Sequence, residues 1–240
     1  MASIGFWGFL FLLPWTNFKF YFGSVLPNWI ENVSIYLSLG LAIPALSLLV
    51  NYLKTVSTRD KESQVVYELI NISFVVFFIT NIFQIVSSLS NLIPLVSFTT
   101  FENAIRYGYI YSLVLIVVPF IYYLIPRIFG REIVHTKMES ANSFLLKSVI
   151  LLSLLVNGII GINSGYSWNA GANAGNPTIY GEGFLITWSL VGTPYTINLF
   201  LSLLLLMGVF LFFLTTIRAI SSGPITEIES VELIEEQVDE

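Results

Sequence analysis

The chain has 240 residues, of which 55% are hydrophobic and only 10% are charged. About a quarter of the residues in a typical soluble domain are charged, so this composition excludes an ordinary soluble protein and predicts a membrane protein. The absence of cysteine excludes disulfides, thiolate metal sites and thiol nucleophiles. The single histidine, His135, argues against a histidine-built haem or metal site, and we expect it to be an ordinary loop residue rather than a pH sensor.

Six apolar blocks, separated by polar residues, glycine or proline, predict six transmembrane helices. Each block approaches the roughly 20 residues that a helix needs to cross the hydrocarbon core. The predicted spans are 3–22, which Pro14, Asn17 and Lys19 interrupt, then 33–54, 66–92, 104–126, 143–162 and 193–219. The sequence therefore predicts an all-α polytopic membrane domain over residues 1–220.

Two segments outside the predicted spans are long enough to have roles of their own. A loop rich in glycine and asparagine, from Asn163 to Gly183, is expected to connect the last two spans and to contact an extracytoplasmic partner subunit. Residues 221–240 form a predicted acidic cytoplasmic tail with seven of the fifteen acidic residues. Blocks of like charge are usually solvated ends, although the apolar residues between these acids also leave docking on a basic partner surface open.

The basic residues give the predicted orientation in the membrane. Eight of the ten flank the second and fourth connections or end the last helix: Lys54, Arg59, Lys61, Arg127, Arg131, Lys137, Lys147 and Arg218. Because positively charged residues favour the cytoplasmic side, we expect a multi-pass plasma membrane protein with both termini in the cytoplasm. The two remaining basic residues, Lys19 and Arg106, fall within predicted spans.

A series of short motifs follows the predicted helices in order. They are Ile4-Gly5-Phe6-Trp7, Pro14-Trp15, Pro27-Asn28-Trp29, Leu39 to Pro44, Val50-Asn51-Tyr52, the run Tyr122-Tyr123-Leu124-Ile125-Pro126-Arg127 with Gly130-Arg131-Glu132 after it, and Thr193-Pro194-Tyr195. Together they resemble helices seven to twelve of haem–copper oxidase subunit I, above all in the B-type and C-type oxidases and the nitric-oxide reductases. The resemblance covers about residues 4–220 and implies the six-helix C-terminal half of that fold.

The same resemblance implies ligands that this chain lacks. In the family, the seventh helix carries two adjacent histidines that bind copper, and the matching positions here are Lys19 and Phe20. The tenth helix carries a His-x-His pair that ligates two haems, and those positions are Ala104 and Arg106. Metal and haem iron need lone-pair donors, which phenylalanine, alanine and the cationic lysine and arginine do not offer. We therefore expect no catalytic residue and no haem or copper in this chain, with both cofactors in a partner subunit.

Lys19 and Arg106 allow two interpretations, because charges within a span are costly and usually face the protein interior or water. They could form a polar cluster with Glu102 in the vacated cofactor cavity, gripping an acidic lipid headgroup or an anionic partner. Alternatively, both snorkel to the interface, and Arg106 pairs with Glu102 one helical turn away. The tyrosines from Tyr107 to Tyr123 are expected to serve packing and anchoring rather than electron or proton transfer.

The leading hypothesis is a non-catalytic accessory subunit of a respiratory terminal oxidase complex. This degenerate subunit I-like half would assemble with the cofactor-bearing subunit and stabilise it, and it would not be an enzyme by itself. A second hypothesis makes the chain the C-terminal half of a split oxidase or reductase. A third makes it a small membrane transporter or channel, in which Lys19 and Arg106 line a path for anions. The expected partners are other subunits of a membrane electron-transport complex and lipids, without nucleic acid.

Overall fold

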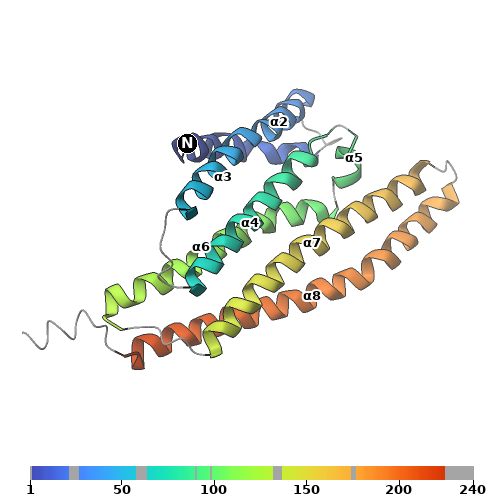
Figure 1. Cartoon of the computed structure of the whole chain (residues 1–240). Coiled ribbons are helices and arrows are strands. Elements are labelled where there is room, and N and C mark those ends of the chain that lie inside the picture. The colour runs from blue at the N-terminus through green and yellow to red at the C-terminus, as the bar shows by residue number, and fades with distance from the viewer. Residues whose placement is uncertain are drawn as a thin grey trace, which may run out of the picture. The chain divides into compact units, whose positions relative to one another are not determined.

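The computed structural model describes residues 2–21, 27–57, 64–89, 91–97, 99–131, 137–173 and 177–224, with the backbone alone at 56–57, 64 and 168–194. Every regular element in these ranges is a helix (Figure 1). In chain order the elements are α1 (Ala2–Leu12), the 3-10 helix η1 (Leu13–Tyr21), α2 (Asn28–Gly40), α3 (Ala42–Ser57), α4 (Gln64–Val86), α5 (Ile93–Val96), α6 (Thr100–Phe129), α7 (Lys137–Asn173) and α8 (Pro177–Ser222).

Five helical stretches of the described residues are long and apolar enough to cross a membrane. They are Asn28–Thr55, Val65–Val86, Thr100–Phe129, Lys137–Ser167 and Tyr195–Ser222. These stretches overlap the last five predicted spans. The prediction of an all-helical polytopic membrane protein is confirmed to that extent.

The first predicted span, 3–22, is not among these five. It is divided into α1, which has 11 residues, and η1, which has nine. The division falls just before Pro14, whose ring removes a backbone donor and disfavours α-helical geometry in the preceding residue. The chain therefore continues beyond Leu12 as a tighter 3-10 helix, and this segment contains Asn17 and Lys19.

The chain divides into two compact units, and α4, α6, α7 and α8 each contribute residues to both. The first unit comprises Met1–Asp60, Val75–Ile110 and Leu152–Leu199. The second unit comprises Lys61–Phe74, Tyr111–Leu151 and Phe200–Glu240. Each unit is described by itself below.

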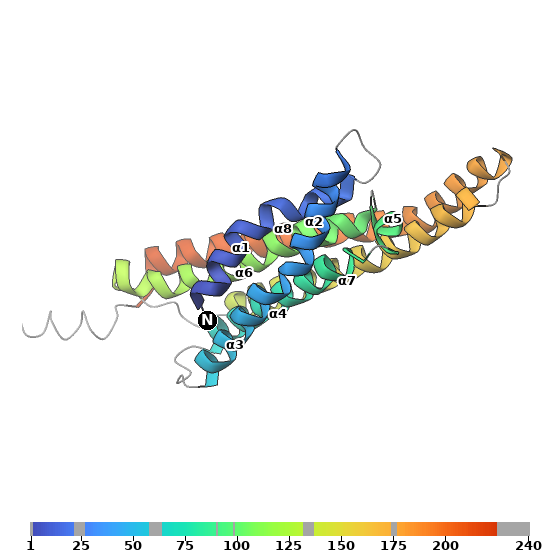
Figure 2. The same cartoon turned by 90° about the horizontal axis from the view of Figure 1, so that it is seen from above.

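In the first unit, α1 and η1 pack along the rod that α2 and α3 form. Helix α1 contacts α3, and η1 contacts α2, so the two segments make an antiparallel hairpin. Hydrogen bonds from Leu41 N to Leu37 O and from Ala45 N to Leu41 O (3.1 and 3.0 Å) continue across the junction of α2 and α3, and Figure 2 shows these helices nearly in line. Gly8 lets α1 approach α3 closely, because a Cβ at this position would lie 2.7 Å from the Cβ of Pro44.

The second unit is held together by contacts between parts of four helices. Ser73 Oγ of α4 donates a hydrogen bond to the carbonyl of Ser112 in α6 (2.8 Å), and Lys147 of α7 forms an ion pair with Glu68 of α4 (2.5 Å). The core between these helices is built from fully or nearly fully buried side chains: Leu69, Leu115, Val118, Ile125, Leu146, Val149, Ile150, Leu201, Phe212 and Ala219.

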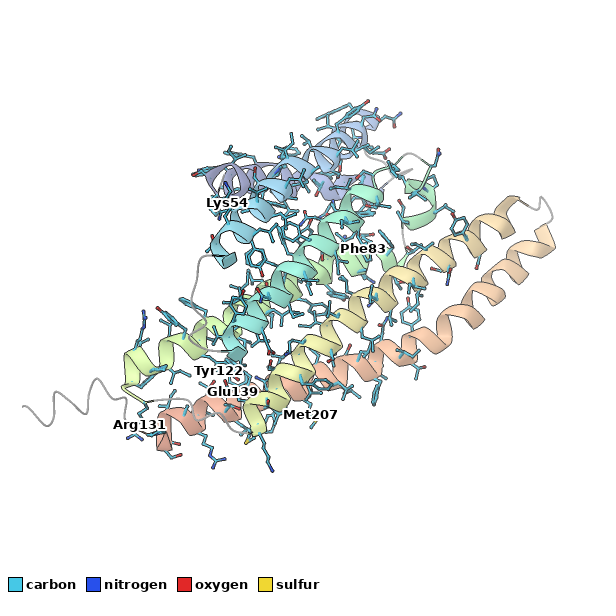
Figure 3. The ribbon with its side chains drawn as sticks, in the orientation of Figure 1. Lys54, Phe83, Tyr122, Arg131, Glu139 and Met207 are labelled. Atoms are coloured by element: carbon cyan, nitrogen blue, oxygen red, sulfur yellow. The ribbon has the colours of Figure 1, made fainter. Side chains whose placement is uncertain are left out.

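Arg131, which follows α6 and is labelled in Figure 3, caps the end of α8 in the same unit. Its Nη1 donates to the carbonyls of Ser221 (3.1 Å) and Gly223 (3.4 Å). The last carbonyls of a helix lack intrahelical donors and carry partial negative charge. A basic side chain therefore stabilises this helix end.

The prediction of a loop from Asn163 to Gly183 between the last two spans is wrong in its extent. Helix α7 continues to Asn173 and α8 begins at Pro177, and only residues 174–176 between them lie outside the described chain. The prediction followed local propensity, since glycine costs about 1 kcal/mol in a helix interior. Here Gly165 serves close packing instead, because a Cβ at this position would lie 1.7 Å from the carbonyl oxygen of Leu95. Tertiary packing thus overrides the propensity signal.

Candidate functional site

Lys19, one of the two basic residues within a predicted span, is buried, with 1% of its surface exposed. It lies on η1, and its ammonium group reaches the end of α4. Nζ donates to the backbone carbonyl of Gln84 and to Ser88 Oγ, both at 2.6 Å. The centroid of the Phe20 ring lies 5.1 Å from the same nitrogen. Lys19 therefore does not snorkel to an interface.

The position of this ammonium group follows from the way α4 ends. Carbonyls in the last turn of a helix need donors from outside the helix. Ser88 N bonds to Ile85 O (3.0 Å), which leaves the Gln84 carbonyl without its usual backbone donor. Lys19 Nζ bonds to this carbonyl together with the hydroxyls of Ser87 and Ser88, both at 2.9 Å. Lys19 is therefore a C-terminal cap for α4, supplied by a distant segment of the chain.

Two serines of α2 bind the backbone of η1 beside this cap. Lys19 N donates to Ser34 Oγ (2.9 Å), and Ser38 Oγ donates to the carbonyl of Thr16 (3.3 Å). Ser34 and Ser38 are four positions apart and fully buried, so they lie on one face of α2. The two hydroxyls therefore tie the backbone of η1 to one face of α2.

The sequence signal for this cap is the occurrence of polar residues in pairs, four positions apart. The predictions from sequence did not include this signal. Ser34 and Ser38 form one such pair in α2, and Gln84 and Ser88 form another at the end of α4. All four are buried. Polar side chains in a transmembrane helix generally face the protein interior, so this spacing marks the faces along which η1, α2 and α4 meet.

Two other positions that the sequence resemblance pairs with ligands of the oxidase family lie in the apolar core of the first unit. Phe20 is 2% exposed and Ala104 is 1% exposed. Phe20 packs with Phe101 and Ile105 of α6, and Val96 completes the buried cluster. Three of the four positions are therefore enclosed by protein: Lys19, Phe20 and Ala104.

Arg106, the fourth position, is on the exterior, with 48% of its side chain exposed, and it forms an ion pair with Glu102. The pairing predicted from their spacing is confirmed. Exposed Ile110 and Leu113 continue the same face of α6. Among the described residues, no hydrogen bond or ion pair joins Arg106 or Glu102 to Lys19, so these contacts do not unite the three residues into one cluster.

The tyrosines of α6 in this unit divide between its interior and its exterior. Tyr109 donates a hydrogen bond from its hydroxyl to Asn81 Oδ1 of α4 (3.1 Å), and its ring packs edge-on against Phe77 at a centroid distance of 6.1 Å. Tyr107 is 45% exposed. These contacts are those of helix packing and surface anchoring.

A pair of asparagines joins α7 and α8 in the first unit. Asn198 Nδ2 donates to Asn157 Oδ1 (2.9 Å), and Asn157 Nδ2 donates to Asn198 Oδ1 (3.2 Å). The backbone carbonyl of Asn157 also accepts a hydrogen bond from Thr100 Oγ1 of α6 (3.2 Å). Because lipid tails are as apolar as leucine, interhelical hydrogen bonds are an important part of helix association in a membrane. Asn157 therefore links three helices.

Some predicted features lie outside the described residues. His135 falls in the stretch 132–136, and all seven acidic residues of the predicted tail fall in 225–240. Within the described ranges, no three His, Asp or Glu side chains are grouped so that they could hold a metal ion.

No protein-family model matches the chain, and a search of curated proteins finds no match. The functional interpretation therefore depends on the geometry at the four positions that the sequence resemblance pairs with metal and haem ligands. Three of them are enclosed in the first unit, and the fourth is paired on its exterior.

Proposed function

We propose that this chain is a non-catalytic membrane subunit of a respiratory terminal oxidase complex, related to the C-terminal half of haem–copper oxidase subunit I. In this proposal the chain holds neither haem nor copper and stabilises the cofactor-bearing subunit beside it. The ordered motifs between Ile4 and Tyr195 support the kinship. The five apolar helices support a site of action in the membrane, and the distribution of basic residues supports a cytoplasmic C-terminus. The proposed plasma membrane orientation with both termini in the cytoplasm requires α1 and η1 together to make a sixth crossing.

The observation that carries the proposal is the set of contacts made at the matched ligand positions. The Lys19 ammonium is bound to the end of α4, and Phe20 and Ala104 are packed in the apolar core. A histidine ligand must present a nitrogen lone pair to its metal, whereas these side chains present hydrogen-bond donors or hydrocarbon to neighbouring protein atoms. Replacement of ligands by residues with structural contacts is what a subunit that has lost catalysis and kept its fold would show.

The rival hypothesis of an anion path gains no support from the same contacts. Lys19 is enclosed and bonded to α4, and Arg106 is neutralised by Glu102. A cation that attracts a permeating anion must be reachable from water, which Lys19 is not.

Isolation of the native assembly tests the proposal. The chain is tagged at its C-terminus and extracted in a mild detergent, and each copurifying subunit is identified and analysed for haem and copper. We expect a haem-bearing subunit in the assembly and no haem on this chain when it is expressed alone. A tagged membrane protein of similar size and abundance from the same cells is the control for non-specific capture. Isolation free of any haem-bearing subunit, or haem bound by this chain alone, would contradict the proposal.

The absence of native cysteine allows the proposed orientation to be tested directly. Asn91→Cys, just before α5, and Ser222→Cys, at the end of α8, introduce single thiols on opposite sides of the membrane in this proposal. A membrane-impermeant maleimide is expected to label N91C in intact cells and S222C only after permeabilisation. Labelling of S222C in intact cells would show that the orientation is reversed.

A further inference from the structure

Arg127, in the last turn of α6, carries a guanidinium group that is stacked on an aromatic ring. Its Cζ lies 3.9 Å from the centroid of the Tyr123 ring, one helical turn back along the same helix. Both side chains are exposed on the second unit. Arginine stacks on aromatic faces through cation–π attraction, and the contact restricts the rotation of its long side chain. The charge of Arg127 is therefore held in place at the surface of α6.

Two other arginines show what this guanidinium lacks. Arg106 forms an ion pair with Glu102, and Arg131 donates to two carbonyls at the end of α8. Among the residues that the structure describes, Arg127 takes part in no hydrogen bond or ion pair. Its contact with the Tyr123 ring uses none of the five N–H donors in a conventional hydrogen bond. These donors are open to an acceptor from outside the described part of the chain.

The length of α6 indicates the depth of Arg127 in a bilayer. The helix has 30 residues, so it is about 45 Å long, whereas the hydrocarbon core of a bilayer is about 30 Å thick. A centred helix therefore extends beyond this core by about five residues at each end. Arg127 is among the last residues of α6, which ends at Phe129. Its guanidinium is thus expected at the level of the lipid headgroups.

An exposed apolar stripe leads from Arg127 toward the middle of α6. Ile116, Phe120 and Tyr123 precede Arg127 at intervals of three or four residues, which places all four on one face of the helix. Ile116 and Phe120 are 45% and 56% exposed. The rise from Ile116 to Arg127 is about 16 Å, close to half of the hydrocarbon thickness. The stripe is therefore about as long as one lipid acyl chain is deep.

We propose that Arg127, held by Tyr123, binds the phosphate of one anionic phospholipid, whose acyl chain packs along Phe120 and Ile116. A guanidinium binds phosphate oxygens through two parallel charge-assisted hydrogen bonds. A zwitterionic headgroup would bring its own cation close to Arg127, so the site favours an anionic headgroup. In the proposed orientation the site faces the cytoplasmic leaflet, whose surface carries anionic lipids. The site requires a bilayer around the chain and does not depend on the kinship with the oxidases.

Native mass spectrometry of the purified full-length chain in a mild detergent tests the proposal. The probe is dioleoylphosphatidylglycerol, and dioleoylphosphatidylcholine is the zwitterionic comparison. We expect the first phosphatidylglycerol to bind about tenfold more tightly than phosphatidylcholine, and Arg127→Gln to abolish this preference. Tyr123→Leu keeps the charge but removes the stacking, so it should weaken phosphatidylglycerol binding about threefold. Lys137→Gln is the matched control, because it removes the same charge from an exposed position at the start of α7. Its lipid preference is expected to equal that of the wild type.

Fluorescence quenching in bilayers shows where the lipid lies, and the absence of native cysteine allows single labels. Phe120→Cys and Phe144→Cys each carry a bimane; both phenylalanines are exposed, and they lie seven positions from Arg127 and Lys137 respectively. Brominated phosphatidylglycerol is expected to quench the bimane at position 120 more than brominated phosphatidylcholine does. This excess should disappear when Arg127→Gln is added, and at position 144 the two lipids should quench nearly equally.

Two outcomes would overturn the proposal. An unchanged lipid preference in Arg127→Gln would leave a protein carboxylate as the partner of the guanidinium. An equal loss of preference in Arg127→Gln and Lys137→Gln would mean that diffuse positive charge attracts the lipid and that no site is built at Tyr123.

Discussion

Replacing Lys19 by methionine removes the ammonium group that caps α4 and keeps a side chain of similar length. In the wild type, Nζ donates to the Gln84 carbonyl and to Ser88 Oγ, both at 2.6 Å. The Gln84 carbonyl keeps the hydroxyl of Ser87 as a donor after the change. The substitution therefore tests the contribution of the charge to the end of the helix rather than the cost of an orphaned acceptor.

The magnitude follows from opposing contributions at the cap. Each hydrogen bond from a charged donor contributes about 1.5–3 kcal/mol, and a cation at a helix C-terminus adds up to about 2 kcal/mol. Enclosing an ammonium group costs several kcal/mol, which Lys19→Met recovers. The two hydrogen bonds and the charge–dipole attraction together exceed that cost, so we expect a net loss of about 1–3 kcal/mol in the free energy of unfolding.

Unfolding in mixed detergent micelles, followed by the fluorescence of the five tryptophans, measures this loss. Lys137→Met is the control, because Lys137 is exposed at the start of α7 and its replacement should change the stability by less than about 0.5 kcal/mol. A Lys19→Met variant at least as stable as the wild type would refute the reasoning, since the buried charge would then contribute nothing to the fold.

Four further substitutions test helix packing at two kinds of contact in the first unit. Asn157→Ala and Asn198→Ala should each destabilise the protein, and a double-mutant cycle should give a coupling energy of about 0.6–1.7 kcal/mol; a coupling near zero would mean that the amide pair does not join α7 to α8. Gly165→Ala should cost about 1–3 kcal/mol or more in the same unfolding assay, because its Cβ would collide with the carbonyl of Leu95. Gly40→Ala has room for a methyl group and should be neutral or mildly stabilising; equal effects of the two alanines would contradict the close-packing account.

Several properties of this protein could be predicted from local sequence. Runs of apolar residues predicted helices that could cross a membrane, and five of the six predicted spans have counterparts among the described helices. Pro14 indicated the break in the first span, because its ring removes a backbone donor and restricts the residue before it. The ion pair of Glu102 with Arg106 was likewise predictable, because residues four positions apart are neighbours on any helix.

Other properties depend on segments that are remote in sequence and could not be predicted in this way. The partners of Lys19 are 65 and 69 positions away, so hydropathy alone could not distinguish a buried cap from a snorkelling lysine. The glycines after residue 160 predicted a loop, but the approach of Leu95 to Gly165 makes them part of a helix interface.

The sequence by itself thus determined that the chain forms apolar helices suited to a membrane, since hydrophobicity and proline act within one turn or one span. The tertiary structure alone decided which polar groups are enclosed and what they bind. The enclosed cap at Lys19 arises where distant segments of the chain meet, and a hydrogen bond depends on distances that only packing fixes.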